Sequence, residues 1–234
     1  MLIMALESAI QESSVAIWQN GIVLASSRQD ITRTQAEMLV LMAKATLDQA
    51  HLSFSDVDLF AVTVGPGSFT GVRVGLATAR GFGLATMRPV AGVTTMEAVA
   101  WAVNIQQSYH EHCKSHYVLV ALTTHYKVFH VQPFSLTATL PVPLCPVQTL
   151  LPAAIADFLT SLPKDIIVVS NNIDLLVAYL PENIRIINGI QPQAWAAAAV
   201  AAARETKSRL APEPLYSRIP VPAFSLPQMQ CTYD

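Results

Sequence analysis

The chain has 234 residues, of which 52% are hydrophobic and 13% are charged, and its formal net charge is −2 at pH 7. This apolar balance predicts extensive burial and a surface partly covered by a partner. The acidic balance argues against a dedicated nucleic-acid surface, which normally has a basic excess. The length suits one large domain or two small ones, each with its own core.

The pattern of apolar residues predicts no membrane span and no secretory leader. The longest alanine-rich run, residues 194–204, is far too short to cross a bilayer and reads as a buried helix. The start of the sequence lacks a basic leader. Cys113, Cys145 and Cys231 are widely separated and odd in number, which favours free thiols. We therefore expect a cytoplasmic protein.

In the first half of the chain, the predicted element order is βββαβαβα. Three β-rich runs, residues 1–7, 13–19 and 22–29, come first, and Asn20 with Gly21 predicts a tight hairpin between the last two. A helix over 35–50, a strand over 57–64, a helix to about 86, a strand over 89–93 and a helix from 94 follow.

The second half predicts a looser version of the same order. Strands over 117–124 and 127–134 pair around a turn near His125, and then come a helix (149–162), a strand (165–171), a helix (172–180) and a strand (184–188). The proline-rich stretch 211–230 is expected to lie extended against the surface. We divide the chain into an N-terminal lobe, 1–103, and a smaller C-terminal lobe, 104–234.

The stretch GPGSFTGVRVG, residues 65–75, joins a predicted strand to a predicted helix, which is the geometry of a phosphate-binding turn. A P-loop needs Lys and then Ser or Thr after its last glycine, whereas Val72 and Arg73 follow Gly71 here. The spacing also differs from the dinucleotide-binding pattern. The candidate residues for a phosphate or nucleotide turn are Glu7, Gly65, Gly67, Ser68 and Thr70. In the alternative, Ser68 and Thr70 only form the turn, with Thr70 as the N-cap of the helix.

Two helices have more apolar surface than one core needs. Residues 38–43 are all apolar, so in a helix they point in every direction. Small residues recur every four positions in the next helix, which allows close approach of another helix, within this chain or from another. The candidate partner interface consists of Met38, Leu39, Leu41, Met42, Gly71, Gly75, Ala79 and Gly83.

Several motifs together resemble the TsaB (YeaZ) family of bacterial tRNA threonylcarbamoyladenosine biosynthesis proteins. They are ALES followed by SSVAIW, then GPGSFTGVRVGLATARGFG, and finally EPLYSR. The resemblance covers most of the first lobe and, weakly, the whole chain. It implies two ribonuclease-H-like lobes of the actin-like, sugar-kinase-like (ASKHA) fold, in agreement with the repeated element order.

The resemblance implies a binding subunit without catalytic residues or a cofactor of its own. Its partner would be the catalytic relative TsaD, at which ATP and magnesium could bind, and which modifies the adenosine next to the tRNA anticodon. The ATPase TsaE joins them, the pure chain would form a homodimer, and tRNA would be contacted only indirectly. The alternatives are an ATPase or kinase-like enzyme of the same fold and, third, direct tRNA binding, which the acidic charge disfavours.

Three departures from the family's patterns and one histidine cluster bear on catalysis and metal binding. Glu7 stands where the family usually has Asp, and we interpret it as a polar strand end in a solvated crevice rather than a magnesium ligand. Gln35 replaces a common histidine, and residues 122–125 replace a DAR-like stretch. The cluster HEHCKSH (His110 to His116) could place zinc ligands on one helix face, but we interpret it as an exposed connection and predict no metal site.

Overall fold

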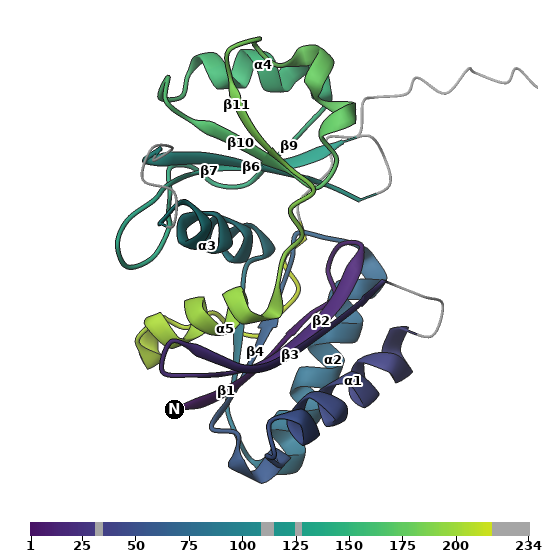
Figure 1. Ribbon diagram of the computed structural model, residues 1–234. Helices are drawn as coiled ribbons and strands as arrows, with labels where there is room; N and C mark the ends of the chain where they lie inside the picture. The colour runs from purple at the N-terminus through teal and green to yellow at the C-terminus, as the bar shows by residue number, and fades with distance from the viewer. Residues whose placement is uncertain (31–34, 109–114, 125–127, 217–234) are drawn as a thin grey trace, which may run out of the picture.

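Two β-sheets, one from each half of the sequence, form the framework of the protein (Figure 1). The computed structural model describes residues 1–30, 35–108, 115–124 and 128–216. The first sheet contains β1 (Leu2–Glu7), β2 (Glu12–Gln19), β3 (Ile22–Asp30), β4 (Leu59–Thr63) and β5 (Val90–Val93). The second contains β6 (Tyr117–Thr123), β7 (Phe129–Ser135), β8 (Val142–Pro143), β9 (Gln148–Leu150), β10 (Ile167–Ser170) and β11 (Arg185–Asn188).

The two sheets share one plan. The first has the order β3-β2-β1-β4-β5, and the second has β8-β7-β6-β10-β11 with β9 beside β7. In each, the first strand in the chain is central, with an antiparallel pair on one side and parallel strands on the other. The prediction of two related α/β lobes, the first with the order βββαβαβα, is therefore confirmed.

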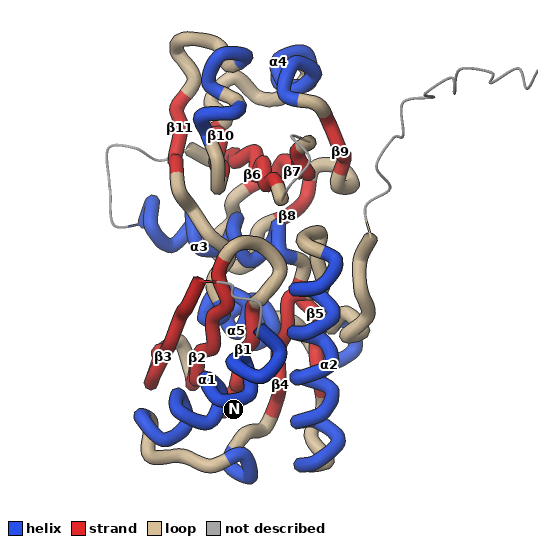
Figure 2. Tube along the Cα trace, turned by 90° about the vertical axis from the view of Figure 1, so that its right-hand side faces the viewer, coloured by secondary structure: helices blue, strands red, loops and turns tan. Residues whose placement is uncertain are grey.

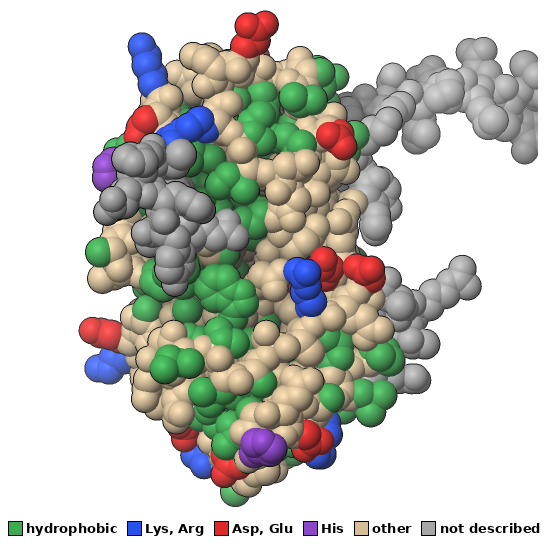
Figure 3. Space-filling view, in the orientation of Figure 1, with side chains coloured by type: hydrophobic (Ala, Val, Ile, Leu, Met, Phe, Trp, Pro, Cys, Tyr) green, Lys and Arg blue, Asp and Glu red, His purple; other side chains and the backbone are tan. Residues whose placement is uncertain are grey.

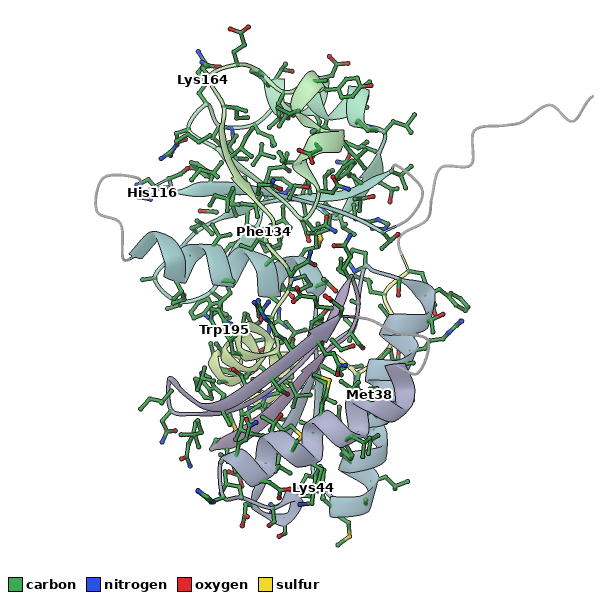
Figure 4. All side chains as sticks on the ribbon, turned by 45° about the vertical axis from the view of Figure 1, so that its right-hand side comes forward. Met38, Lys44, His116, Phe134, Lys164 and Trp195 are labelled. Carbon is green, nitrogen blue, oxygen red and sulfur yellow. The ribbon has the colours of Figure 1, made fainter. Side chains whose placement is uncertain are left out.

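Within the ranges that the structure describes, five α-helices cover the sheets in layers (Figures 1 and 2). They are α1 (Gln35–Gln49), α2 (Phe69–Thr86), α3 (Thr95–Ser108), α4 (Pro152–Thr160) and α5 (Ala194–Ala203). On the first sheet, α1 and α2 cover one face and α5 covers the other. Between α5 and the second sheet lies α3, while α4 covers the far face of that sheet. Figure 4 places Phe134 and Trp195 in the region between the two sheets.

The alternation of side chains along the central strands explains this layering. Val118 and Val120 of β6 belong to the same core cluster as Val99 and Val103 of α3. Leu119 of β6, together with Ala121, belongs to the cluster that includes the α4 residues Ile155 and Leu159. Because successive residues of a strand point to opposite faces, one apolar strand can join two separate cores.

The hairpin between β2 and β3 forms where the sequence predicts it. Asn20 has φ 50° and Gly21 has φ 91°. Two consecutive positive φ angles are typical of the tight turn whose twist matches that of the flanking strands. Asn tolerates this conformation and Gly adopts it freely, so this dipeptide sets the register of the sheet edge.

The expected division at residues 103 and 104 falls inside α3. The alanine-rich α5, from the expected second lobe, is buried as predicted, but it packs on β1, β2 and β4 of the first sheet. Six of its residues, all Ala or Val, join a core cluster with Ile3 and Ala5 of β1. Small side chains let this short helix lie close to the sheet. The helix thereby packs a late segment of the described chain against β1, its first strand.

Some second-half predictions were wrong. Residues 172–180 form two short 3-10 turns, Ile173–Leu175 and Val177–Tyr179, instead of one helix. The segment is short and ends before Pro181, and isolated short segments gain little from helical hydrogen bonding. Helix α4 begins at Pro152 because proline suits the first helical position, which leaves the residues before it free to form β9.

Candidate functional site

Residues 65–68, which we call the glycine turn, lie between β4 and α2, at the edge of the first lobe. The backbone N–H of Thr95 donates to Gly65 O at 2.9 Å, which ties the turn to the start of α3. Ser68, with extended backbone angles, is the N-cap of α2, and its side chain accepts from Gly71 N at 2.9 Å. The prediction of Thr70 as N-cap was wrong because α2 already begins at Phe69, and Thr70 lies exposed in the first turn.

The glycines of this turn contact the backbone of the same chain. Ser68 N donates to Ala9 O at 2.6 Å. A Cβ atom on Gly67 would lie 2.4 Å from Ala9 O, and one on Gly71 would lie 1.9 Å from Ser8 O. Only glycine permits this approach. Carbonyl oxygens of Ser8 and Ala9 therefore lie directly against the glycines at the start of α2.

Glu7 ends β1 directly before this contact and has no exposed surface. One of its carboxylate oxygens, Oε1, accepts from Ala9 N at 2.7 Å. Burial raises the pKa of Glu7 to about 7, although hydrogen bonds from the Thr63 side chain and from the backbone of Ala9 and Ile10 act in the opposite direction. The expectation of a solvated crevice was wrong, and an enclosed, partly protonated carboxyl group does not fit a magnesium-nucleotide site.

Residues 210–216 close the other side of the turn (Figure 2). Gly92 N donates to Leu210 O at 2.8 Å, and Leu215 N donates to Val64 O at 2.7 Å. A Cβ atom on Gly65 would lie 2.8 Å from Leu215 O. The expectation of an extended segment on the surface is confirmed for these residues, which hold the turn between β1 and the end of the described chain.

The ridge of small residues on α2 faces the core of the same chain. Gly71, Gly75, Ala79 and Gly83 are all buried. A Cβ atom on Gly75 would lie 2.7 Å from Ser8 Oγ, and one on Gly83 would lie 2.4 Å from Val90 Cγ2. The ridge therefore allows close packing on the first sheet rather than on a partner helix, which corrects the sequence-based expectation and settles the open alternative for these four residues.

The candidate residues on α1 divide between core and surface. Leu39 and Met42 are buried in the core, and Met38 is half-buried near the N-terminal end of the helix (Figure 4). Leu41, in contrast, is 62% exposed, and its neighbour Val40 is also exposed. The all-round apolar run thus lies partly in the core and partly on the surface, and only its exposed part is available to another molecule.

The candidate interface residues chosen from the sequence do not include those on the outward side of α2. Phe69 is 63% exposed and Leu84 is 83% exposed, and Met87, which follows the helix, is also exposed. We call Val40 and Leu41 of α1 together with Phe69, Leu84 and Met87 the outer apolar surface. The signal was present in the sequence, because Phe69, Arg73, Arg80 and Leu84 recur at helical spacing opposite the glycines. Figure 3 shows other apolar side chains reaching the surface of the lower lobe, between scattered charged groups.

An exposed aromatic and cationic cluster stands at the N-terminal end of α2. Arg73 lies over the ring of Phe69, with its guanidinium carbon 3.2 Å from the ring centroid. Tyr216 stacks against Phe69 at a centroid distance of 6.1 Å. Farther along α2, Arg80 donates to the backbone oxygen of Pro212. Helix α2 contains no acidic residue, so its outward side is apolar and positively charged.

Some candidate residues lie outside the described part of the chain. Among the cluster HEHCKSH, the residues His110, His112 and Cys113 are outside it, whereas His116 is exposed just before β6 (Figure 4). Cys231 is also outside it, and Cys145 is a half-buried free thiol. Within the described ranges, no helix combines the length and hydrophobicity that a membrane crossing requires.

Known proteins resemble this chain in both sequence and fold. The family model for TsaD, tRNA N6-adenosine threonylcarbamoyltransferase, matches residues 26–122. The Escherichia coli K12 tRNA threonylcarbamoyladenosine biosynthesis protein TsaB is 35% identical over 100 residues, 43% of each chain. The Thermosipho africanus transferase is 28% identical over 138 residues, 53% of this chain and 41% of the relative. The chain thus spans less than half the length of these curated relatives.

Solved structures agree on the fold along nearly the whole chain. YeaZ from Pseudomonas aeruginosa has a TM-score of 0.77 and 22% identity, over 92% of this chain and 99% of that one. A polyphosphate/ATP-glucomannokinase from Arthrobacter has a TM-score of 0.55 and 12% identity, over 86% and 98%. The predicted ASKHA fold is confirmed. The sequence similarity to TsaB, together with the YeaZ-like fold, confirms the resemblance to the TsaB (YeaZ) family that the sequence motifs indicate.

Proposed function

We propose that this chain is a non-catalytic subunit of the complex that makes threonylcarbamoyladenosine next to the tRNA anticodon, and that it binds a TsaD-like catalytic subunit. The observation that carries this proposal is the outer apolar surface on α1 and α2. Similarity to TsaB and the match to the TsaD model support the process and the class of partner.

The outer apolar surface has the composition of an interaction site. Exposed Leu41 and Leu84 gain free energy when a partner covers them, because burial removes apolar area from water. Phe69 and Arg73 add an aromatic ring and a guanidinium, which are enriched among energetically important interface residues. The complementary partner surface is apolar with acidic groups at its rim.

The closed glycine turn favours binding over turnover. Carbonyl oxygens of Ser8 and Ala9 occupy the approach to the turn, and Glu7 is enclosed. A kinase-like enzyme of this fold would need both places open to a nucleotide and its metal. In our proposal the ATPase activity of the complex belongs to a TsaE-like subunit, tRNA is contacted through the complex, and the pure chain self-associates through the same surface.

Mixing the chain with the TsaD-like protein of its own organism tests the proposal. We expect co-elution in gel filtration and a measurable affinity by calorimetry. Leu41→Arg and Leu84→Arg should each lower the affinity by about a hundredfold, because a buried unpaired charge costs several kcal/mol. Ala154→Arg, the same kind of change at an exposed position on α4, should leave the affinity unchanged. Co-elution that survives both leucine variants would place the interface elsewhere.

Activity measurements address the alternative function. We expect the pure chain to hydrolyse no ATP and to modify no tRNA, and we expect ATP with magnesium to leave its thermal stability unchanged. Turnover that exceeds a Glu7→Ala control would favour the enzyme and overturn the non-catalytic part of the proposal.

A further inference from the structure

The outward side of α2 carries two arginines that have no carboxylate partner in the described chain. Arg73 and Arg80 are exposed, and among the described residues no carboxylate lies within ion-pair distance of either guanidinium. Arg73 lies over the ring of Phe69, and Arg80 donates to the backbone oxygen of Pro212. Helix α2 itself contains no acidic residue. The positive charge of this side therefore remains available to a group from another molecule.

An apolar groove lies along α2 between these two charges. It has a volume of about 300 Å³, and it is lined by Phe69, Thr70, Arg73, Val74, Ala77 and Thr78. Arg73 is part of its wall, and Arg80 follows two residues after the last lining residue. Ala77 is exposed and has the smallest side chain of the groove, so another helix can come closest to α2 at this residue.

We propose that Arg73 and Arg80 make α2 select an acidic helix of the TsaD-like subunit over a second copy of this chain. This inference rests on the proposed function, because it requires that both molecules bind the same surface. It adds the chemistry of the choice, which is that the partner helix carries carboxylates opposite the two arginines.

Two copies of α2 that meet at this groove bring arginines together. Arg73 lies four positions before Ala77, and Arg80 lies three positions after it. In an antiparallel two-fold contact centred at Ala77, Arg73 of one copy therefore lies beside Arg80 of the other, and the symmetry repeats this pair. In a parallel contact, each arginine faces its own counterpart. Juxtaposed like charges weaken such an interface and so suppress the wrong partner.

The neighbouring helix of a second copy supplies no free carboxylate from its described side chains. Helix α1 packs beside α2, and Asp48 is the only acidic residue among the side chains of α1 that the structure describes. Asp48 already forms an ion pair with Lys44. A second copy thus offers apolar area to the groove, whereas an acidic helix offers both apolar area and the opposite charge.

The aromatic cluster holds Arg73 ready for a carboxylate. Its guanidinium carbon lies 3.2 Å from the ring centroid of Phe69 and 5.5 Å from that of Tyr216. Cation–π contacts of this kind restrict the side chain before a partner arrives, so less conformational entropy is lost on binding. The rings also shield the guanidinium partly from water, which strengthens its attraction to a carboxylate.

Ionic strength tests the selection in the unmodified full-length chain. Raising the NaCl concentration from about 50 mM to about 500 mM should weaken binding of the TsaD-like protein about tenfold and strengthen self-association about tenfold, because salt screens both the attraction and the repulsion. Calorimetry measures the first affinity, and sedimentation equilibrium measures the second. A change of both affinities in the same direction would overturn the selection.

Neutralising the two arginines tests whether they cause it. Arg73→Gln combined with Arg80→Gln should lower the affinity for the TsaD-like protein about tenfold and raise self-association about tenfold. Lost packing cannot produce these opposite signs, because it would weaken both associations. Arg28→Gln removes the same charge from an exposed position on β3 and should change neither. A double variant that behaves like this control, or that weakens both associations, would contradict the proposal.

Charge reversal tests the contact between two copies separately. When the parent chain is mixed with isotopically labelled Arg73→Glu/Arg80→Glu, mixed pairs should form at least about tenfold more tightly than pairs of the parent chain, because each arginine then faces a glutamate. Native mass spectrometry counts the three species. A statistical mixture, or the absence of mixed pairs, would show that the arginines do not face each other. If the parent chain does not bind the TsaD-like protein at all, the proposed function fails, while this mixture still decides whether the arginines oppose self-association.

Discussion

The inner and outer sides of α2 differ in residue size, in exposure to solvent and in charge. The inner side consists of small residues, and Gly71 and Gly75 lie against Ser8, which directly follows β1. On the outer side are large exposed residues, Phe69 and Leu84, with arginines between them. Small residues at helical spacing thus mark where a helix approaches its own sheet. The surface that another chain can reach is the side that lacks them.

An arginine should unfold the protein on the inner side of α2 and be tolerated on the outer side. Gly75→Arg should unfold the first lobe, with a loss of more than about 4 kcal/mol, because even a Cβ atom there would lie 2.7 Å from Ser8 Oγ. Gly81→Arg should leave the fold intact, because nothing lies within 4 Å of its Cβ position. Circular dichroism melts of the two variants check this. A folded Gly75→Arg variant would show that the inner side of α2 is not closely packed.

The same comparison can be made with two leucines. Leu76→Ala removes a buried side chain from the inner side and should lower the free energy of unfolding by about 2–5 kcal/mol. Leu84→Ala should change stability by less than about 0.5 kcal/mol, because Leu84 is mostly exposed, and it should instead weaken association by about tenfold. Urea denaturation and calorimetry measure the two quantities. A stability loss of equal size in both variants would contradict the assignment of the sides.

A pH titration tests the burial of Glu7, which directly precedes the contact between Ser8 and the inner side of α2. The pKa of Glu7 is raised from 4.5 to about 7 by burial, so between these values the folded state binds a proton that the unfolded state has lost. This contribution is fully present below pH 4.5 and is lost as the pH rises through 7, by roughly 3 kcal/mol. Glu7→Gln should remove the pH dependence and be more stable than the parent chain at pH 8.

Urea denaturation of both proteins at pH 5 and pH 8 provides the measurement. Parallel stability curves for Glu7→Gln and the parent chain would contradict a buried, titrating carboxyl group.

The sequence predicted those parts of the fold that local patterns determine. Asn20 and Gly21 predicted the first hairpin, and apolar runs located every described strand except β8 and β9. It could not show that α5 returns to the first sheet, because that contact joins residues nearly two hundred positions apart. Nor could it show that Ser8 and Ala9 fill the glycine turn. A glycine is equally suited to a phosphate, a partner helix or a backbone carbonyl, and only the three-dimensional arrangement distinguishes them.

The same Gly→Ala substitution should change stability in opposite directions on the two sides of α2. Gly81 is exposed in the middle of α2 with an ordinary helical φ, so Gly81→Ala restricts the unfolded chain without introducing a contact. Its free energy of unfolding should rise by about 0.5–1 kcal/mol.

Gly75→Ala gains the same entropy term, yet its Cβ would press on Ser8 Oγ, whose position is fixed by the hydrogen bond to Gly71 O at 2.8 Å. Gly75→Ala should therefore be destabilising. Urea denaturation of both variants gives the two signs directly, and equal signs would mean that Ser8 can move away. If Gly81→Ala stabilises the chain but weakens its association, the partner backbone approaches α2 at Gly81, which would extend the outer apolar surface to the middle of the helix.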